Sequence, residues 1–162
     1  MIFQSSDSRE KHLVITDADE QTIPQGAASE PRQIRVLIVD DERDAVETLS
    51  AILLMEGYST FGLYKGSEVL PRMQAINPHA VILDIDLSVG PSGFSIAREI
   101  RERYGEHAPL LIAMSGKFKG QIDKLLGHIN GFDHYCLKPC EPQELLTLLE
   151  PLRNGADPAV LP

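Results

Sequence analysis

Two apolar runs of this chain are each followed at once by acidic residues. Asp40 and Asp41 come after the first run, and Asp84 and Asp86 come after the second. If the two runs are neighbouring strands, three or more of these carboxylates meet at one edge of a sheet, where they repel and raise one another's pKa values. A hard divalent cation removes that conflict. Mg²⁺ is suited to the position, because it binds a few carboxylate and carbonyl oxygens and keeps several waters.

Two further apolar runs end in residues that complement such a centre. Ser115 follows one run and supplies a hydroxyl donor, and Lys138 follows the other and supplies a compact positive charge. A metal ion, an ammonium group and a hydroxyl around a carboxylate nucleophile are what a phosphoryl group in transit requires. Each feature alone is common in loops. Their joint occurrence at the same ends of successive strands indicates phosphoryl chemistry.

The elements that must position these residues are short and regularly spaced. Five runs rich in Val, Ile and Leu are bounded by turn residues, and several are almost continuously apolar, which is typical of strands buried on both faces of a parallel sheet. Segments with helical periodicity lie between them. Five repeats of strand then helix predict a doubly wound α/β fold. The predicted strands are 34–39, 59–63, 80–83, 110–114 and 134–137.

The helical segments carry individual start signals. Ser92 is a plausible N-cap for a helix over 93–104, and Pro142 is expected in the first turn of the last helix. The segment around 67–76 is the least regular, because it contains Pro71. Apolar residues between 122 and 129 mark the fourth of the five expected helices.

Composition and charge bound the possible functions. The 162 residues carry a net charge of -9 and a sequence pI of about 4.9, with no basic patch, so we expect no nucleic-acid partner. Two cysteines are too few for a disulfide framework and fit a reducing compartment. The start of the chain lacks the pattern of a secretory signal, and no apolar run is long enough to span a membrane. These features predict a cytoplasmic protein without a membrane partner.

The composition also suggests the domain organisation. We expect residues 34–152 to form one domain, preceded by a flexible N-terminal extension over 1–33 and followed by a short C-terminal tail over 153–162. Residues 13–16 within the extension have strand-like character. They could join a sheet edge or pair with a second copy of the chain, which leaves a homodimer possible.

Four segments together resemble the receiver domain of bacterial two-component response regulators. They lie at the ends of the first, third, fourth and fifth predicted strands, with a spacing within about one residue of the family pattern. The resemblance covers 34–152 and implies a flavodoxin-like five-stranded parallel sheet in the order 2-1-3-4-5 with five helices. The segments are Val36-Leu37-Ile38-Val39-Asp40-Asp41-Glu42, Val81-Ile82-Leu83-Asp84-Ile85-Asp86-Leu87, Ala113-Met114-Ser115-Gly116 and Tyr135-Cys136-Leu137-Lys138-Pro139.

The same resemblance implies a role for each acidic residue. Asp84 would accept a phosphoryl group from a phosphohistidine on a sensor histidine kinase or a histidine phosphotransfer protein. Asp41 and Asp84 would ligate Mg²⁺ directly, and Asp40 would contribute through water. The backbone carbonyl of Asp86 would complete the protein ligands.

The resemblance also implies how the phosphoryl group is sensed. Ser115 would donate a hydrogen bond to it, and Lys138 would pair with its charge. Tyr135 would be the aromatic switch that turns inward when Ser115 moves towards the phosphate. Since the chain leaves no room for an output domain, we expect a stand-alone receiver, not an enzyme, that signals to a downstream protein partner through phosphorylation-dependent contacts.

The chain departs from the family pattern in the loop after the phosphoacceptor. The family usually has proline four residues after that aspartate and glycine eight residues after it. This chain has Ser88 and Ser92 at those positions, with Gly93 one place late. The loop therefore holds one extra residue, which could alter kinase docking or the rate of dephosphorylation.

Two alternative functions remain open from the sequence. Asp84 and Asp86 also resemble the paired aspartates of haloacid-dehalogenase-type phosphatases, although that family carries its nucleophile on the first strand. A receiver fold that acts only as a non-phosphorylated interaction module is the other alternative. A zinc site is not expected from Cys136 and Cys140, because two ligands without a nearby His or Cys are too few.

Overall fold

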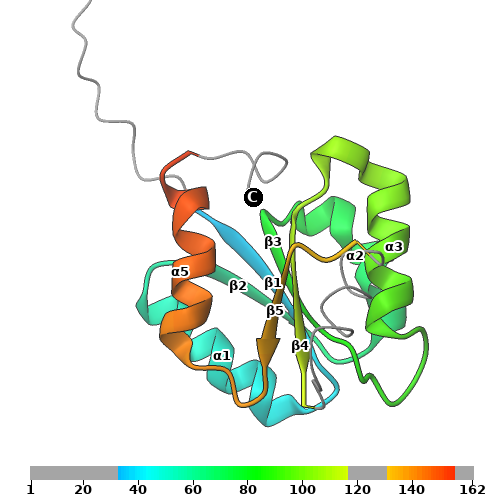
Figure 1. Cartoon of the computed structure of the whole chain (residues 1–162), viewed down its shortest axis with the longest axis horizontal. Helices are drawn as coiled ribbons and strands as arrows, with labels where there is room; N and C mark the ends of the chain where they lie inside the picture. The colour runs from blue at the N-terminus through cyan, green and yellow to red at the C-terminus, as the bar shows by residue number, and fades with distance from the viewer. Residues whose placement is uncertain (1–32, 117–130, 156–162) are drawn as a thin grey trace, which may run out of the picture.

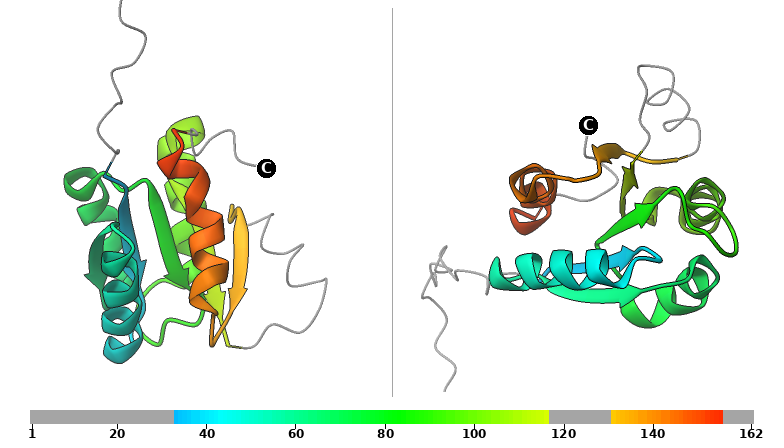
Figure 2. Two further views of the ribbon diagram at one scale, coloured as in Figure 1. Left: turned by 90° about the vertical axis from the view of Figure 1, so that its left-hand side faces the viewer. Right: turned by 90° about the horizontal axis from the view of Figure 1, so that it is seen from below.

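The computed structural model describes residues 33–116 and 131–155, and within them the chain forms one five-stranded sheet with helices on both faces (Figures 1 and 2). All pairings are parallel, and the strand order is β2-β1-β3-β4-β5. The predicted α/β sheet and its order are confirmed. The strands are β1 (Arg35–Val39), β2 (Ser59–Leu63), β3 (Ala80–Asp84), β4 (Leu110–Ser115) and β5 (His134–Leu137).

Two of the three central strands are buried along their whole length, and the third is buried except at its first residue, as the continuous apolar runs predicted. Every residue of β3 and β4 is buried, whereas the edge strands β2 and β5 are partly exposed. Both faces of a parallel sheet are covered by its crossover helices, so its central strands need apolar side chains on both sides.

Four α-helices lie within the described residues, and two cover each face of the sheet (Figure 2). Buried side chains of α1 and α5 form one core with alternate strand residues such as Val36 and Ile38. Buried side chains of α2 and α3 form a second core with Leu37 and Val39. The helices are α1 (Arg43–Met55), α2 (Val69–Ile76), α3 (Gly93–Tyr104) and α5 (Pro142–Arg153), with 3₁₀ turns at Gly66–Glu68 and Gly105–His107.

The helix starts follow local capping chemistry. The Ser92 hydroxyl accepts a hydrogen bond from the Ser95 backbone N–H at 3.3 Å, which confirms the predicted N-cap. Pro142 is the first residue of α5, as predicted. Pro71 is the third residue of α2, a first-turn position whose N–H has no intrahelical acceptor, so the helix tolerates it. The expected fourth helix falls in 117–130, outside the described residues.

The start of α3 packs directly on the end of β3. A Cβ atom at Gly93 would lie 2.4 Å from the backbone carbonyl oxygen of Asp84, closer than any side chain can approach. The Gly93 N–H donates to the Ile85 carbonyl at 3.3 Å. A residue without a side chain is therefore required where the helix meets the acidic edge of the sheet.

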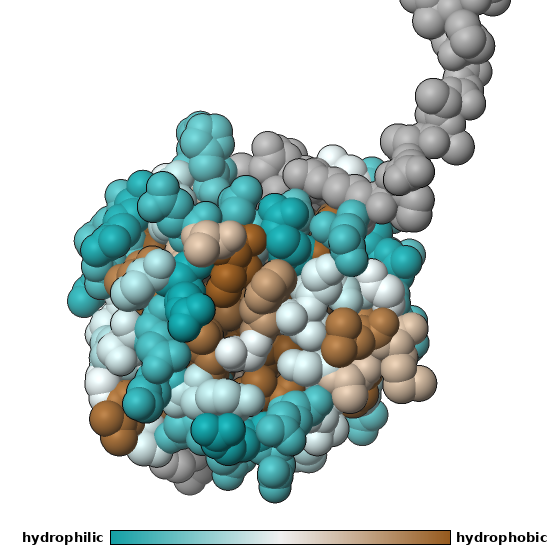
Figure 3. Space-filling model, turned by 180° about the vertical axis from the view of Figure 1, so that it is seen from behind, coloured by the Kyte–Doolittle hydropathy of each residue, from teal (hydrophilic) through white to brown (hydrophobic). Residues whose placement is uncertain are grey.

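The surface of the described residues is mainly polar. Its large exposed apolar side chains are Leu54 and Met55 at the end of α1, Phe61 in β2, Val89 and Leu137. Seen from behind, polar residues surround an area of apolar ones (Figure 3). No helix within the described ranges is long and apolar enough to cross a bilayer.

Candidate functional site

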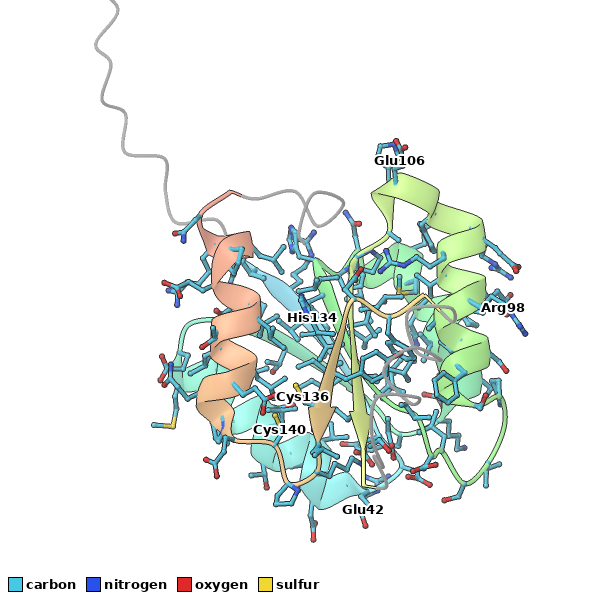
Figure 4. The ribbon with its side chains drawn as sticks, in the orientation of Figure 1. Glu42, Arg98, Glu106, His134, Cys136 and Cys140 are labelled. Atoms are coloured by element: carbon cyan, nitrogen blue, oxygen red, sulfur yellow. The ribbon has the colours of Figure 1, made fainter. Side chains whose placement is uncertain are left out.

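Three carboxylates converge at the carboxyl edge of the sheet. Asp40 follows the last residue of β1, Asp41 comes next, and Asp84 ends the neighbouring strand β3. One oxygen from each carboxylate lies within 4.8 Å of the other two. Asp40 and Asp84 are only 4% and 5% exposed. Glu42, labelled in Figure 4, marks this edge of the molecule. The predicted meeting of these carboxylates at one rim is confirmed.

Lys138 supplies the positive charge between two of these acids. Its Nζ lies 2.6 Å from Asp40 Oδ2 and 3.0 Å from Asp84 Oδ2. Its backbone N–H donates to the Ser115 carbonyl at 2.9 Å, which continues the pairing of β5 with β4. Burial of the ammonium lowers the pKa of Lys138, but the hydrogen bonds and charges of the two carboxylates outweigh burial and raise it above its ordinary value.

Backbone N–H groups orient the remaining oxygens of the two buried acids. Asp40 Oδ1 accepts a hydrogen bond from the Glu42 N–H at 2.9 Å, and Asp84 Oδ1 accepts one from the Asp86 N–H at 3.0 Å. Each bond closes a turn between an aspartate and the residue two positions later. These turns hold the carboxylates at the strand ends.

Asp86 itself contributes no carboxylate to this group. Its side chain is exposed, and the acidic cluster among the described residues contains Asp40, Asp41 and Asp84. The contact of Asp86 with the site is the N–H bond to Asp84 Oδ1. The expectation that its backbone carbonyl binds a cation stays a prediction.

Asp41 is held by Ser88, a residue for which the sequence predicted no contact. The Ser88 N–H donates to Asp41 Oδ2 at 2.9 Å, and the Ser88 hydroxyl donates to the same oxygen. The hydroxyl bond, followed by the N–H bond, lowers the pKa of Asp41 below its ordinary value. The only sequence signal was a hydroxyl residue at the usual proline position.

Ser115 and Tyr135 lie on neighbouring strands and on the same face of the sheet. Ser115 ends β4, is 6% exposed, and is in register with Leu137 of β5, two residues after Tyr135. The Tyr135 ring packs edge-on against Phe132, with the centroids 5.6 Å apart. Burial, with a contribution from the charge of Asp133, raises the pKa of Tyr135. The switch role of this pair stays a prediction.

The strand order, with three carboxylates at the carboxyl edge of the sheet, is that of the CheY-like, flavodoxin-type fold. Residues 36–150 match the response regulator receiver domain, and the chain belongs to this family. The resemblance inferred from the four segments is therefore confirmed. The family is a signalling domain of two-component systems, which favours a receiver over the phosphatase alternative.

Curated relatives of this chain are also named as response regulators. The DNA-binding response regulator MtrA of Mycolicibacterium smegmatis is 32% identical over 127 residues, which cover 77% of this chain and 54% of MtrA. MtrA of Mycobacterium tuberculosis gives the same figures. The chain thus spans about half the length of the curated relatives it matches.

Solved receiver structures show the same fold. A CheY-like receiver domain protein from Methanospirillum hungatei has a TM-score of 0.67 at 22% identity, covering 76% of this chain and 95% of that one. A CheY-like receiver domain from Methylobacillus flagellatus has a TM-score of 0.63 at 27% identity, covering 73% of this chain and 97% of that one.

Proposed function

We propose that this protein accepts a phosphoryl group on Asp84 from a phosphohistidine, in the presence of Mg²⁺, and signals through phosphorylation-dependent protein contacts. The observation that carries the proposal is the placement of Lys138, whose Nζ lies 3.0 Å from Asp84 Oδ2 at an edge shared with Asp40 and Asp41. A carboxylate nucleophile, a cation and further acids at the end of a central strand suit phosphoryl transfer.

The donor set fits Mg²⁺. Three carboxylates and one ammonium leave the described site with a formal charge of -2, and their oxygens are the hard ligands that this ion prefers. Asp41 and Asp84 would hold the ion directly and Asp40 through water, with the Asp86 carbonyl as a further ligand. The bound ion would offset the charge of the carboxylates and of an incoming phosphoryl group.

In the transfer itself, a carboxylate oxygen of Asp84 attacks phosphorus. The bond from phosphorus to the partner's imidazole nitrogen breaks, an acyl phosphate forms, and the imidazole is released. Lys138, which contacts Asp84, would pair with the transferred group. The Asp86 N–H, which donates to Asp84 Oδ1, holds the carboxylate in one orientation.

The product is sensed from the neighbouring strand. A phosphoryl group replaces a single negative charge with a larger one and adds acceptor oxygens. Ser115, at the end of β4, donates a hydrogen bond by moving towards it. Tyr135, two residues before the register partner of Ser115, then moves into the space released. The surface around β4 and β5 changes shape, and a partner binds the two forms with different affinities.

We propose protein partners on both sides of this step: a histidine kinase or histidine phosphotransfer protein as donor, and a downstream protein as receiver of the signal. The MtrA relatives are named DNA-binding regulators, and this chain matches about half of their length. We propose that this receiver signals through protein contacts and does not itself bind nucleic acid, because its net charge of -9 repels a phosphate backbone. A phosphorylation-dependent pull-down that recovered DNA and no protein would contradict this.

The direct test is labelling with acetyl phosphate or beryllofluoride in the presence of Mg²⁺. Asp84→Asn should abolish modification. Asp86→Asn is the matched control, because the Asp86 carboxylate is exposed while its N–H and carbonyl remain. Unchanged labelling of Asp84→Asn would refute the assignment. Steady turnover of phosphomonoesters that is lost in Asp86→Asn would favour the haloacid-dehalogenase-type alternative.

A further inference from the structure

A second group of metal-ligating side chains lies apart from the three aspartates. It consists of Cys136 in β5, Cys140 in the connection after β5, and Glu144 in the first turn of α5. One ligand atom from each residue lies within 4.8 Å of the other two. Figure 4 shows the two cysteines between β5 and α5. Three different segments thus bring two sulfurs and a carboxylate to one place.

The contacts within this group are those of uncoordinated thiols. Cys140 Sγ lies 3.8 Å from Glu144 Oε2 and 3.6 Å from the Glu141 carbonyl oxygen, so its thiol has two weak acceptors. Burial raises the pKa of both cysteines. Without a metal ion, both therefore remain protonated at neutral pH, whereas coordination to a metal removes the proton from a thiol.

The two cysteines alone were too few to predict a zinc site, but the structure adds Glu144 as a third ligand. We propose that Cys136, Cys140 and Glu144 bind a thiophilic divalent metal ion such as Zn²⁺. Two sulfur ligands and one oxygen ligand favour zinc over the magnesium that suits the aspartate cluster. Binding converts both thiols to thiolates and releases two protons to solvent. Three protein ligands leave the fourth position of a tetrahedral zinc ion for water or an external ligand.

The spacing of the ligand atoms is close to what zinc needs. A Zn–S distance of about 2.3 Å places two tetrahedral sulfur ligands about 3.8 Å apart. The present limit of 4.8 Å therefore requires movements of about 1 Å. Cys140 and Glu144, in the connection and the helix start, are the more exposed ligands and can adjust towards Cys136, which is 1% exposed in the strand.

A cavity lies beside one of the three ligands. A cavity of about 560 Å³ is lined by residues of α1, the start of α5 and the β5–α5 connection, and Cys140 and Lys138 are both among its lining residues. Cys136 and Cys140 lie two residues before and two residues after Lys138. A metal ion bound to both cysteines would hold the backbone on each side of the lysine that contacts Asp84.

The test is a Zn²⁺ titration of the fully reduced, full-length chain against a chromophoric chelator, with Mg²⁺ in excess to occupy the aspartates. We expect one equivalent of Zn²⁺ per chain, and a cadmium–thiolate absorption band when Cd²⁺ replaces Zn²⁺. Cys140→Ser and Glu144→Gln should each weaken binding about tenfold or more, since losing even an outer-shell partner costs about that much. Glu141→Gln is the matched control and should bind as the unmodified chain does.

Two further measurements distinguish this site from zinc binding elsewhere on the chain. Asp41→Asn should leave Zn²⁺ uptake unchanged, which excludes binding at the aspartate cluster. Zn²⁺ should protect Cys140, the more exposed of the two cysteines, from a maleimide reagent. Absence of uptake in excess Mg²⁺, equal affinity in Cys140→Ser and the unmodified chain, or unchanged labelling of Cys140 in the presence of Zn²⁺ would overturn the proposal. Circular dichroism of each variant establishes that it is folded, so these outcomes report on the ligands.

Discussion

Replacing Lys138 with methionine removes the ammonium group that joins the ends of β1 and β3, and so tests how much this group stabilises the fold. Its contacts of 2.6 Å to Asp40 and 3.0 Å to Asp84 each correspond to about 5–6 kcal/mol of attraction at an effective dielectric constant of about 20. Desolvation of the charges offsets most of this. Removal of one partner from a buried pair typically costs about 3–5 kcal/mol. Because the lysine side chain is 24% exposed, we expect a smaller loss of about 2–3 kcal/mol.

The assay is urea and thermal unfolding in the absence of divalent cations. For a domain of this size, a loss of about 2–3 kcal/mol lowers the melting temperature by about 10 °C. Added Mg²⁺ should stabilise Lys138→Met more than the unmodified chain, because a cation then replaces the missing charge among three carboxylates. Lys65→Met is the matched control: Lys65 is exposed and should change stability by less than about 0.5 kcal/mol.

A double-mutant cycle with Asp40→Asn measures the pair itself. The two substitutions should be less destabilising together than their sum by about 1–3 kcal/mol, since each removes a partner of the same contact. Two results would show that this ion pair does not stabilise the strand ends. One is that the losses of unfolding free energy in the two single variants add within about 0.3 kcal/mol. The other is that Mg²⁺ stabilises Lys138→Met and the unmodified chain equally.

Three further substitutions or modifications probe single features. Gly93→Ala should destabilise the fold by about 1–3 kcal/mol in urea, because its Cβ would meet a backbone carbonyl at 2.4 Å; a neutral effect would contradict this. A maleimide at pH 7 should label half-buried Cys140 well before buried Cys136, whose pKa is raised by burial, and the opposite order in peptide mapping would contradict this. Ser88→Ala removes the bond that lowers the pKa of Asp41, so its stability deficit should be present at pH 7 and shrink below about pH 3.8, as that carboxylate protonates in both proteins; a deficit independent of pH in acid titrations would argue against it.

The sheet could be predicted because its signals are local. Runs such as 80–83 and 110–114 contain the apolar side chains that both faces of a central strand require, and the turn residues around them fix their ends. The N-cap at Ser92 was predictable for the same reason, since the cap bond spans three residues. Pro71 made α2 hard to predict only because the exact start of that helix, at Val69, was not evident.

The unpredicted contacts all join distant parts of the chain or depend on loop conformation. Ser88 and Asp41 are separated by 47 positions, and their bonds depend on the path of the loop after β3. Glu144 joins the two cysteines because α5 starts directly after the short connection that follows β5. Sequence periodicity specifies which face of an element is buried. It does not specify which polar side chains meet between elements.

The close backbone contact at Gly93 makes the α3 side of the site more rigid than the side formed by β4 and β5. With no side chain between the helix start and the Asp84 carbonyl, α3 and the end of β3 have no compressible layer between them, and they form a stiff corner. Ser115 and Lys138, on the opposite side, reach the site through side chains that can change rotamer. We therefore expect the proposed phosphorylation-dependent change at Asp84 to propagate in one direction, through β4 and β5, while α3 keeps its position.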